Sequence, residues 1–268
     1  MWASCCKPRP ANPFIFPAFS VMKQLLSSLA LAASLLLAAP AACAQDDPGM
    51  SMFNSANQMA VSLSLTQLNN DAVLASTHGT AARSGTAATA GKATRTSFAY
   101  VPTATLQKQT ADAYVAQVKA TNPAAAATVA TALAGKTNYP ALYHELNSGT
   151  GLRENDAADV MALFLLENWV IANGVTDARV ITAAKTQGVR KQVAGILARN
   201  PKLGSTAALA QLGEQLKLNA AMLEVGRMRT QHDGTSAAYS QKVAAQFRNQ
   251  YHFDLSQFQL TTQGLVKK

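Results

Sequence analysis

The stretch DAADVMALFLLENWVIANG, residues 156–174, decides the fold. Its apolar residues occupy nearly every side of a helix rather than one stripe, and a helix of that kind lies inside a protein core. Asp156 can cap the N-terminus, Asp159 suits the positive end of the helix dipole, and Gly174 suits the C-terminal cap. We therefore predict a central core helix over these residues.

Helical patterns also lie upstream of this stretch. Tyr114 and Val118 share one face of a predicted helix that ends near Pro123, because proline stops a helix. An alanine-rich helix is then expected to run to Gly135, and a short helical piece covers residues 139–146. These segments predict a helical arrangement before the core helix begins.

Downstream, three more helices are predicted, over residues 177–200, 205–230 and 235–251. The second of them carries two apolar stripes, so it should pack against neighbours on both sides. One stripe is Leu209, Leu212, Leu216, Ala220 and Leu223, and the other is Leu218, Met222 and Val225.

The tail after residue 252 is apolar and is expected to dock as a hydrophobic strap through Phe253, Leu255, Phe258 and Leu260. No strand pattern with turn signals is recognised after residue 100. The predicted fold class is therefore all-α, a compact bundle of roughly six helices.

The N-terminal part has the organisation of a secretory signal peptide. Met22 and Lys23 begin a positive region, residues 25–39 are apolar, and Ala42 and Ala44 suit the signal peptidase. Cleavage after Ala44 predicts a periplasmic or secreted protein. Since 15 apolar residues are fewer than the roughly 20 of a membrane span, no transmembrane anchor is expected after cleavage.

Two alternatives remain at this end of the chain. Residues 1–21 are interpreted as an over-extended start before the true initiator Met22, although they could be a translated extension. Cys43 could carry a lipid, but Pro40 stands where lipoproteins usually have an aliphatic residue. The predicted organisation is an extra start at 1–21, a signal peptide at 22–44, an N-terminal segment and linker at 45–100, and a helical domain at 101–268.

Signal cleavage changes the charge and the cysteine content. Loss of Lys7, Arg9 and Lys23 leaves 20 basic residues against all 14 acidic residues, a net charge of +6. All three cysteines leave as well, which excludes a disulfide, a thiolate nucleophile and a cysteine-ligated metal from the remaining 224 residues. Residues 77–96 contain no large apolar side chain and predict a flexible linker.

Two glutamates are the candidate catalytic residues. Glu167 stands among Phe164, Leu166 and Val170, and burial there would raise its pKa, as a general acid requires. Glu145 is the weaker candidate. The structural alternative for Glu167 is an ion pair, with Arg153 or with a base on the next helix.

A catalytic pair within the core helix is disfavoured by its spacing. Asp156, Asp159 and Glu167 fall on one side of the predicted helix, but eight residues rise about 12 Å. Glycosidase carboxylates lie roughly 5 to 9.5 Å apart. We therefore expect Asp156 and Asp159 to be capping residues.

Other chemistries lack their motifs. His144 and Glu145 could begin a zinc-protease helix, but Ser148 stands where the second histidine is needed. No nucleophile elbow and no phosphate loop is found either. With the zinc motif incomplete, no metal and no cofactor is expected. Six bases crowd the predicted helix at 177–200 and the two residues after it but scatter around it, which favours a solvated basic face over a nucleic-acid site. These are Arg179, Lys185, Arg190, Lys191, Arg199 and Lys202.

Several short strings resemble an uncharacterised family of exported bacterial helical domains. They are Asn155 to Asp159, Trp169 with Asn173 and Gly174, Phe253 to Leu255, and Leu260 to Leu265. The resemblance covers about residues 98–266. It implies a helical fold and export, and it brings no established activity, cofactor or site residue.

The leading functional hypothesis is a non-enzymatic binding or interaction module of the cell envelope. Its partner would be an unknown protein or an anionic envelope polymer, attracted by the basic surface. The alternative is a cell-wall-directed hydrolase with Glu167 or Glu145 as general acid, so the sequence leaves open whether the protein is an enzyme. An enzyme needs a cleft with a convergent buried carboxylate, whereas an interaction module needs an exposed apolar patch.

Overall fold

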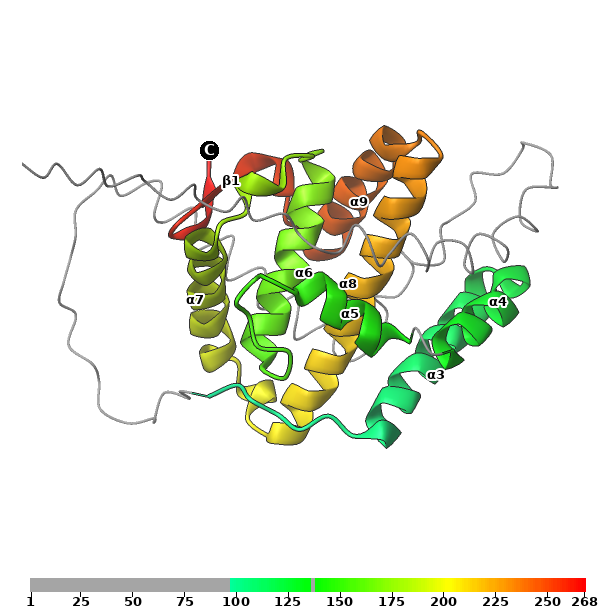
Figure 1. Cartoon of the computed structure of the whole chain (residues 1–268). Helices are drawn as coiled ribbons and strands as arrows, with labels where there is room; N and C mark the ends of the chain where they lie inside the picture. Colours follow the sequence, from blue (N-terminus) through cyan, green and yellow to red (C-terminus); the bar gives the residue numbers. More distant parts are fainter. Residues whose placement is uncertain (1–96, 136–137) are drawn as a thin grey trace, which may run out of the picture.

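The computed structural model describes residues 97–135 and 138–268 (Figure 1). Within these residues the chain forms seven α-helices, three short 3-10 helices and one two-stranded hairpin. The α-helices are α3 (Ala104–Thr121), α4 (Pro123–Ala134), α5 (Tyr139–Asn147), α6 (Ala157–Ala172), α7 (Ala183–Arg199), α8 (Thr206–His232) and α9 (Ser236–Tyr251). The shorter elements are η2 (Ala178–Val180), η3 (Pro201–Leu203), η4 (Leu255–Gln257), β1 (Phe258–Thr261) and β2 (Gly264–Lys267). The predicted helical architecture is confirmed: seven α-helices correspond to the seven predicted helical segments, for a bundle expected to hold roughly six.

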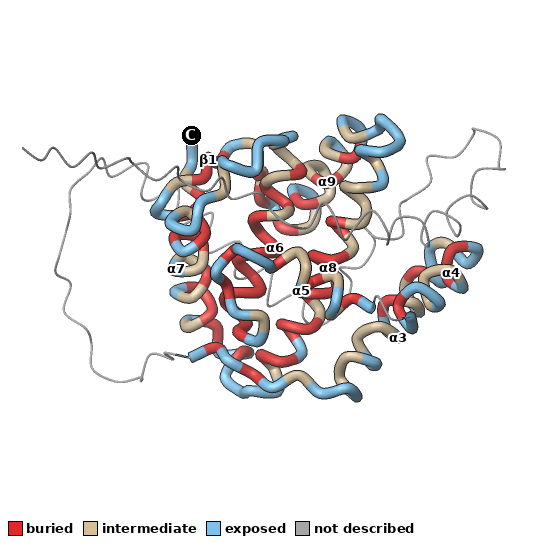
Figure 2. The backbone as a smooth tube through the Cα atoms, in the orientation of Figure 1, coloured by how far each residue is buried: buried red, intermediate tan, exposed pale blue. Residues whose placement is uncertain are grey.

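α6 is the central helix. It packs against α7, α8 and α9, and its residues are buried along nearly its whole length (Figure 2). The Asp156 carboxylate caps it by accepting hydrogen bonds from the backbone N–H groups of Ala158 and Asp159, at 3.1 and 3.2 Å. Gly174 follows the C-terminus with a φ of 60°, which favours glycine. The predicted core helix and its caps are confirmed.

α8 separates two apolar cores, as its two stripes predict. The larger core includes Leu209, Leu212, Leu216, Ala220 and Leu223 together with α6, α7 and α9. The smaller core joins Leu218 and Ala221 to Tyr114 and Val118 of α3, with Met222 packed against it. α3 and α4 form a helical hairpin that stands to one side of the bundle (Figure 1).

The C-terminal tail corrects the all-α prediction. β1 and β2 form an antiparallel hairpin in which Leu260 pairs with Leu265, and Gly264 closes the turn with a φ of 110°. The apolar tail residues are buried as expected. Phe253 lies just before η4, and Leu255, Phe258 and Leu260 lie in η4 and the hairpin. The Trp169 Nε1–H donates to the Phe258 carbonyl at 2.9 Å, which fixes the hairpin to α6.

The helix predicted over residues 177–200 is interrupted. Residues 178–180 form η2, and α7 begins only after Thr182, whose hydroxyl accepts a hydrogen bond from the Lys185 N–H at 3.4 Å. Thr182, the sixth residue of the predicted helix, is thus the N-cap at which α7 begins.

The hairpin packs against α7 without room for a side chain. A Cβ at Gly188 would lie 2.4 Å from the Thr262 carbonyl oxygen and 2.7 Å from the Gly264 nitrogen. Beside it, the Gln192 side chain bonds the backbone of Leu265 twice, accepting from N–H and donating to C=O, each at 3.0 Å. The Gln192 amide thus hydrogen-bonds the backbone of β2 in the way that the backbone of a neighbouring strand would.

Gly188→Ala should therefore destabilise the protein by about 1 to 3 kcal/mol, because the hairpin has to shift. Urea unfolding measures the change. Gly195→Ala is the matched control on the same helix, since its Cβ would meet nothing within 4 Å. Alanine replaces glycine there in an open helix interior, so Gly195→Ala should stabilise by about 0.5 to 1 kcal/mol. Shifts of the same sign in both variants would contradict this packing.

The packed body includes residues before the expected domain start at 101. Phe98 and Tyr100 are buried, and Ala99 forms a β-bridge with Asp156. The signal peptide at 22–44, its cleavage after Ala44, the lipid alternative at Cys43, the start at Met22 and the linker at 77–96 lie outside the described residues.

Candidate functional site

Glu167 lies on α6, and the charges of Glu224 and Arg227 on α8 influence its pKa. Arg227 is already engaged: its Nε and Nη2 donate to the two carboxylate oxygens of Glu224, each at 2.6 Å. Although part of the Glu167 residue reaches the surface, its Oε2 is buried and has no hydrogen-bond partner among the described residues. The structure thus leaves one carboxyl oxygen without a donor inside a helix interface.

This environment favours the neutral form of Glu167. Burial raises its pKa to about 8, the nearby Glu224 adds to the rise, and Arg227 opposes it. A carboxyl that keeps its proton at neutral pH can donate it, as a general acid must. Here, however, the neighbouring carboxylate is held by two guanidinium hydrogen bonds and is not available as a partner base.

Glu145 takes no part in this cluster. It lies on α5 in a partly exposed position, and its backbone carbonyl accepts the Ser148 N–H at the end of that helix. The neighbouring His144 pairs with Glu154, which raises the pKa of the imidazole. The two predicted candidates, Glu145 and Glu167, are therefore not brought together.

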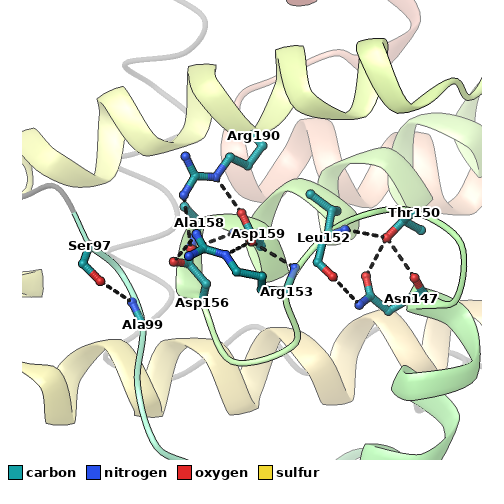
Figure 3. A network of polar contacts seen from close by, with 10 residues as sticks. All are labelled: Ser97, Ala99, Asn147, Thr150, Leu152, Arg153, Asp156, Ala158, Asp159 and Arg190. Carbon is teal, nitrogen blue, oxygen red and sulfur yellow. Dashed lines mark hydrogen bonds and ion pairs between the residues drawn. The ribbon is translucent and has the colours of Figure 1, made fainter.

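Asp156 and Asp159 lie in an ion network at the start of α6 (Figure 3). Arg153 donates to Asp156 Oδ2 at 2.7 Å and to Asp159 Oδ2 at 2.8 Å, and Arg190 of α7 donates to Asp159 Oδ1 at 2.6 Å. The network ties the loop before α6 to α7. Asp156 caps α6 as predicted, but the Asp159 carboxylate in the first turn accepts from Arg153 and Arg190 rather than from an N–H of α6. The suggested pairing of Arg153 with Glu167 is wrong.

A buried cluster around Glu214 was missed by the sequence analysis. Both Glu214 and Lys217 of α8 are buried, and their Oε1 and Nζ atoms lie 2.8 Å apart. Tyr100 donates its hydroxyl to Glu214 Oε1 at 3.1 Å, and Tyr139 donates to Oε2 at 2.8 Å. The Lys217 ammonium donates further to Asn155 Oδ1 at 2.8 Å.

The cluster is closely packed, and its carboxylate and ammonium are hydrogen-bonded, although the buried Tyr143 hydroxyl has no hydrogen-bond partner among the described residues. Lys217 Nζ lies 5.3 Å from the centre of the Tyr100 ring and 5.7 Å from that of Tyr143, at cation–π distances. Gly213 leaves room for the Tyr100 ring, which a Cβ would approach to 2.4 Å. Burial raises the pKa of Tyr100 well above its usual range, so its hydroxyl stays a donor. These contacts describe a structural junction rather than a reactive centre.

The sequence contained a signal for this junction. Glu214 and Lys217 are charges three residues apart on a helix with apolar stripes on both sides. Charged residues between two buried stripes are buried only when they are paired.

The basic residues of α7 divide into two groups. Arg190 faces the aspartates of α6, as described above. Lys191 and Arg199 are exposed, whereas Lys185 is partly buried and donates to the Val180 carbonyl. We call these three residues, together with the exposed Lys202 of η3, the α7 basic face. On a helix with 100° per residue, residues 185, 191 and 199 fall within an arc of about 120°. Arg190 lies outside this arc, and Arg179 and Lys202 lie in η2 and η3 rather than on α7.

No family model, curated protein or solved structure matches the chain. The resemblance to exported helical domains therefore stays a prediction. Among residues 97–135 and 138–268, no helix combines the length and hydropathy that a bilayer span needs. The same residues contain no group of three or more His, Cys, Asp or Glu placed to hold a metal ion.

Proposed function

We propose that the protein is an exported, non-enzymatic module of the cell envelope that binds an anionic polymer through the α7 basic face. The observation that carries this proposal is the charge of residues 178–213, which contain six bases and no acid. Lys191, Arg199 and Lys202 of this segment are exposed. An exposed surface of one sign attracts polymers of the opposite sign.

The kind of side chain that is exposed favours a charged polymer over a protein as the partner. In the described part of the chain, Val101 is the exposed large hydrophobic residue, with 76% of its surface accessible. Protein interfaces use apolar patches of several hundred Å². An anionic polymer needs positive charge at the surface instead.

A cell-wall-directed hydrolase is the second candidate, because Glu167 keeps its proton at neutral pH as a general acid does. Its buried Oε2 and the engagement of Glu224 by Arg227 speak against that role. The assay is release of reducing ends from cell-wall glycan by the full chain. Release that Glu167→Gln abolishes would replace the binding proposal.

Binding to long-chain inorganic polyphosphate tests the proposed function. Lys191→Gln, Arg199→Gln and Lys202→Gln together should weaken binding of the full chain about tenfold at 50 mM salt. They should also reduce the dependence of log K on log salt, because fewer counterions are released. Fluorescence anisotropy at several salt concentrations measures both.

The matched control removes three bases elsewhere: Lys119→Gln, Arg229→Gln and Lys242→Gln on α3, α8 and α9. It has the same net charge as the α7 triple variant and should weaken binding less than about threefold. Equal losses in both variants would show that net charge, rather than the α7 basic face, attracts the polymer. Absence of binding by the full chain would overturn the proposal.

A further inference from the structure

Two dipeptides of the chain place an asparagine or aspartate directly before a glycine, Asn173-Gly174 and Asp233-Gly234. In such a pair the backbone nitrogen of the glycine can bond to the side-chain Cγ of the residue before it, because glycine has no Cβ to hinder the approach. The product is a succinimide ring, which water opens again. Whether a pair reacts in the folded protein depends on how firmly the fold holds its atoms apart.

The Asn173-Gly174 pair is held in place at the end of α6. The Asn173 Nδ2 donates to the carbonyls of Trp169 and Leu255, at 2.9 and 3.3 Å. The attacking nitrogen is engaged as well, because the Gly174 N–H donates to the Ile171 carbonyl at 3.0 Å. The Asn173 ψ is 4°, and turning the backbone and the side chain until the nitrogen meets Cγ breaks these three hydrogen bonds.

The Asp233-Gly234 pair lies in the turn between α8 and α9. Both residues are exposed, and a Cβ at Gly234 would meet nothing within 4 Å. Within residues 97–135 and 138–268, the Gly234 N–H forms no hydrogen bond. The next N–H, of Thr235, donates to the Thr230 carbonyl at 2.8 Å, and Thr235 begins α9 without a side-chain cap. Turning the Asp233 ψ, which is −1°, therefore breaks one backbone hydrogen bond.

We propose that Asp233 is a site of spontaneous backbone isomerisation to isoaspartate, and that the fold protects the Asn173-Gly174 pair from the equivalent reaction. In the first step the Gly234 nitrogen bonds to Cγ of the protonated Asp233 carboxyl, and the hydroxyl leaves as water with the N–H proton. In the second step water opens the ring at the main-chain carbonyl, so the chain continues through Cγ. One water leaves and one enters, so the composition is unchanged and the step needs no oxidant or cofactor. This inference is independent of the proposed function.

The structural effect of the reaction is confined to the turn. Isomerisation adds Cβ of residue 233 to the main chain and leaves the free carboxylate on Cα. The Asp233 carboxylate of the structure lies 2.9 Å from His232 Nδ1 and 3.6 Å from Arg229 Nε, and both pairs are rearranged. The contact that joins α9 to α8 further inside is the hydrogen bond from the Tyr239 hydroxyl to the Leu223 carbonyl, at 3.0 Å. It lies away from the turn and remains.

The pH dependence of the reaction identifies the residue that reacts. The charged groups that act on Asp233 are His232 and Arg229, and they hold the pKa of its carboxyl below the usual range, mainly through the hydrogen bond with His232. Ring closure needs the carboxyl with its proton, so Asp233 should react faster at pH 5 than at pH 8. An asparagine reacts faster at pH 8, because the glycine nitrogen attacks an amide after losing its proton.

The test incubates the full chain at 37 °C for several weeks at pH 5 and at pH 8, both folded and in guanidinium chloride. Trypsin then releases residues 154–179 and 230–242, and mass spectrometry with electron-transfer fragmentation locates isoaspartate in each peptide. Asn173 should react about a hundredfold more slowly in the folded protein at pH 8 than in guanidinium chloride, because three hydrogen bonds have to open. Asp233 at pH 5 should stay within about tenfold of its rate in guanidinium chloride, because one hydrogen bond has to open.

Two variants assign the reaction to residue 233. Asp233→Glu keeps the charge, but ring closure would require a larger ring, so the isoaspartate in residues 230–242 should disappear. Asp233→Asn should react faster than wild type at pH 8 and should reverse the pH dependence. Isoaspartate that persists in Asp233→Glu would overturn the assignment.

The folded protein decides between reaction and protection at the two pairs. If residue 233 reacts in guanidinium chloride but not in the folded protein, the proposed site is overturned. Equal rates for Asn173 in both conditions would overturn the proposed protection. Urea unfolding before and after incubation at pH 5 should give the same free energy, and a loss would contradict a change confined to the turn.

Discussion

Replacing Glu167 with glutamine should raise the free energy of unfolding at pH 7 by about 3 kcal/mol, although most substitutions lower it. Burial raises the pKa of Glu167 from 4.5 to about 8, with Glu224 adding to the rise and Arg227 opposing it. At pH 7 the unfolded chain has released this proton and the folded protein keeps it. Folding must therefore take up a proton, at a cost of about 1.4 kcal/mol per pH unit above 4.5. Glutamine carries no such cost.

The raised pKa of Glu167 also fixes the direction in which the stability difference between wild type and Glu167→Gln changes with pH. Below pH 4.5 the carboxyl of Glu167 is protonated in both states, so Glu167→Gln and wild type should be about equally stable. Between pH 4.5 and about 8 the unfolded state binds fewer protons, and wild type loses stability relative to Glu167→Gln. Above about pH 8 both states are ionised and the difference stays at its largest value.

Urea unfolding at pH 5, 7 and 8.5 measures this difference. Glu145→Gln is the control, because it makes the same chemical change on a partly exposed glutamate of α5. Its stability relative to wild type should not follow this pH dependence. A difference for Glu167→Gln that is the same at pH 5 and pH 8.5 would mean that Glu167 is solvated rather than confined between α6 and α8.

The helices could be predicted because the spacing of their apolar residues indicates which helix faces are buried. α6 is apolar on all sides, and α8 carries two stripes that pack into two cores. The hairpin was missed because each strand has only four residues, too few to show an alternating pattern. Its turn residue Gly264 and its partner Gln192 act through contacts between distant segments, which no local pattern reveals.

The candidate site was predicted in part. The apolar neighbours of Glu167 indicated its burial, but its neighbours Glu224 and Arg227 lie 57 and 60 residues further along the chain. Local sequence cannot show which basic residue meets which acidic residue. The same limit hid the packing of residues 98–100, because Tyr100 is joined to Glu214 across 114 residues.

Lys217→Met should destabilise the protein by about 3 to 5 kcal/mol, the largest loss expected from a single substitution here. Lys217 is the charge that neutralises Glu214, and both side chains are almost wholly buried. Methionine keeps the length of the lysine stem but leaves a carboxylate in the interior with only the hydroxyls of Tyr100 and Tyr139. An unpaired buried charge costs far more than the pair contributes.

The double variant Lys217→Met with Glu214→Gln decides the cause of that loss. Glutamine can still accept hydrogen bonds from Tyr100 and Tyr139 but carries no charge, so the double variant should be more stable than Lys217→Met alone. Urea unfolding of the four forms gives the coupling between the two residues. The exposed pair Arg229 and Asp233 on the same helix is the control, and Arg229→Met with Asp233→Asn should show no such rescue. Losses that simply add in the double variant would mean that Lys217 acts by packing against Tyr100 and Tyr143 rather than by neutralising Glu214.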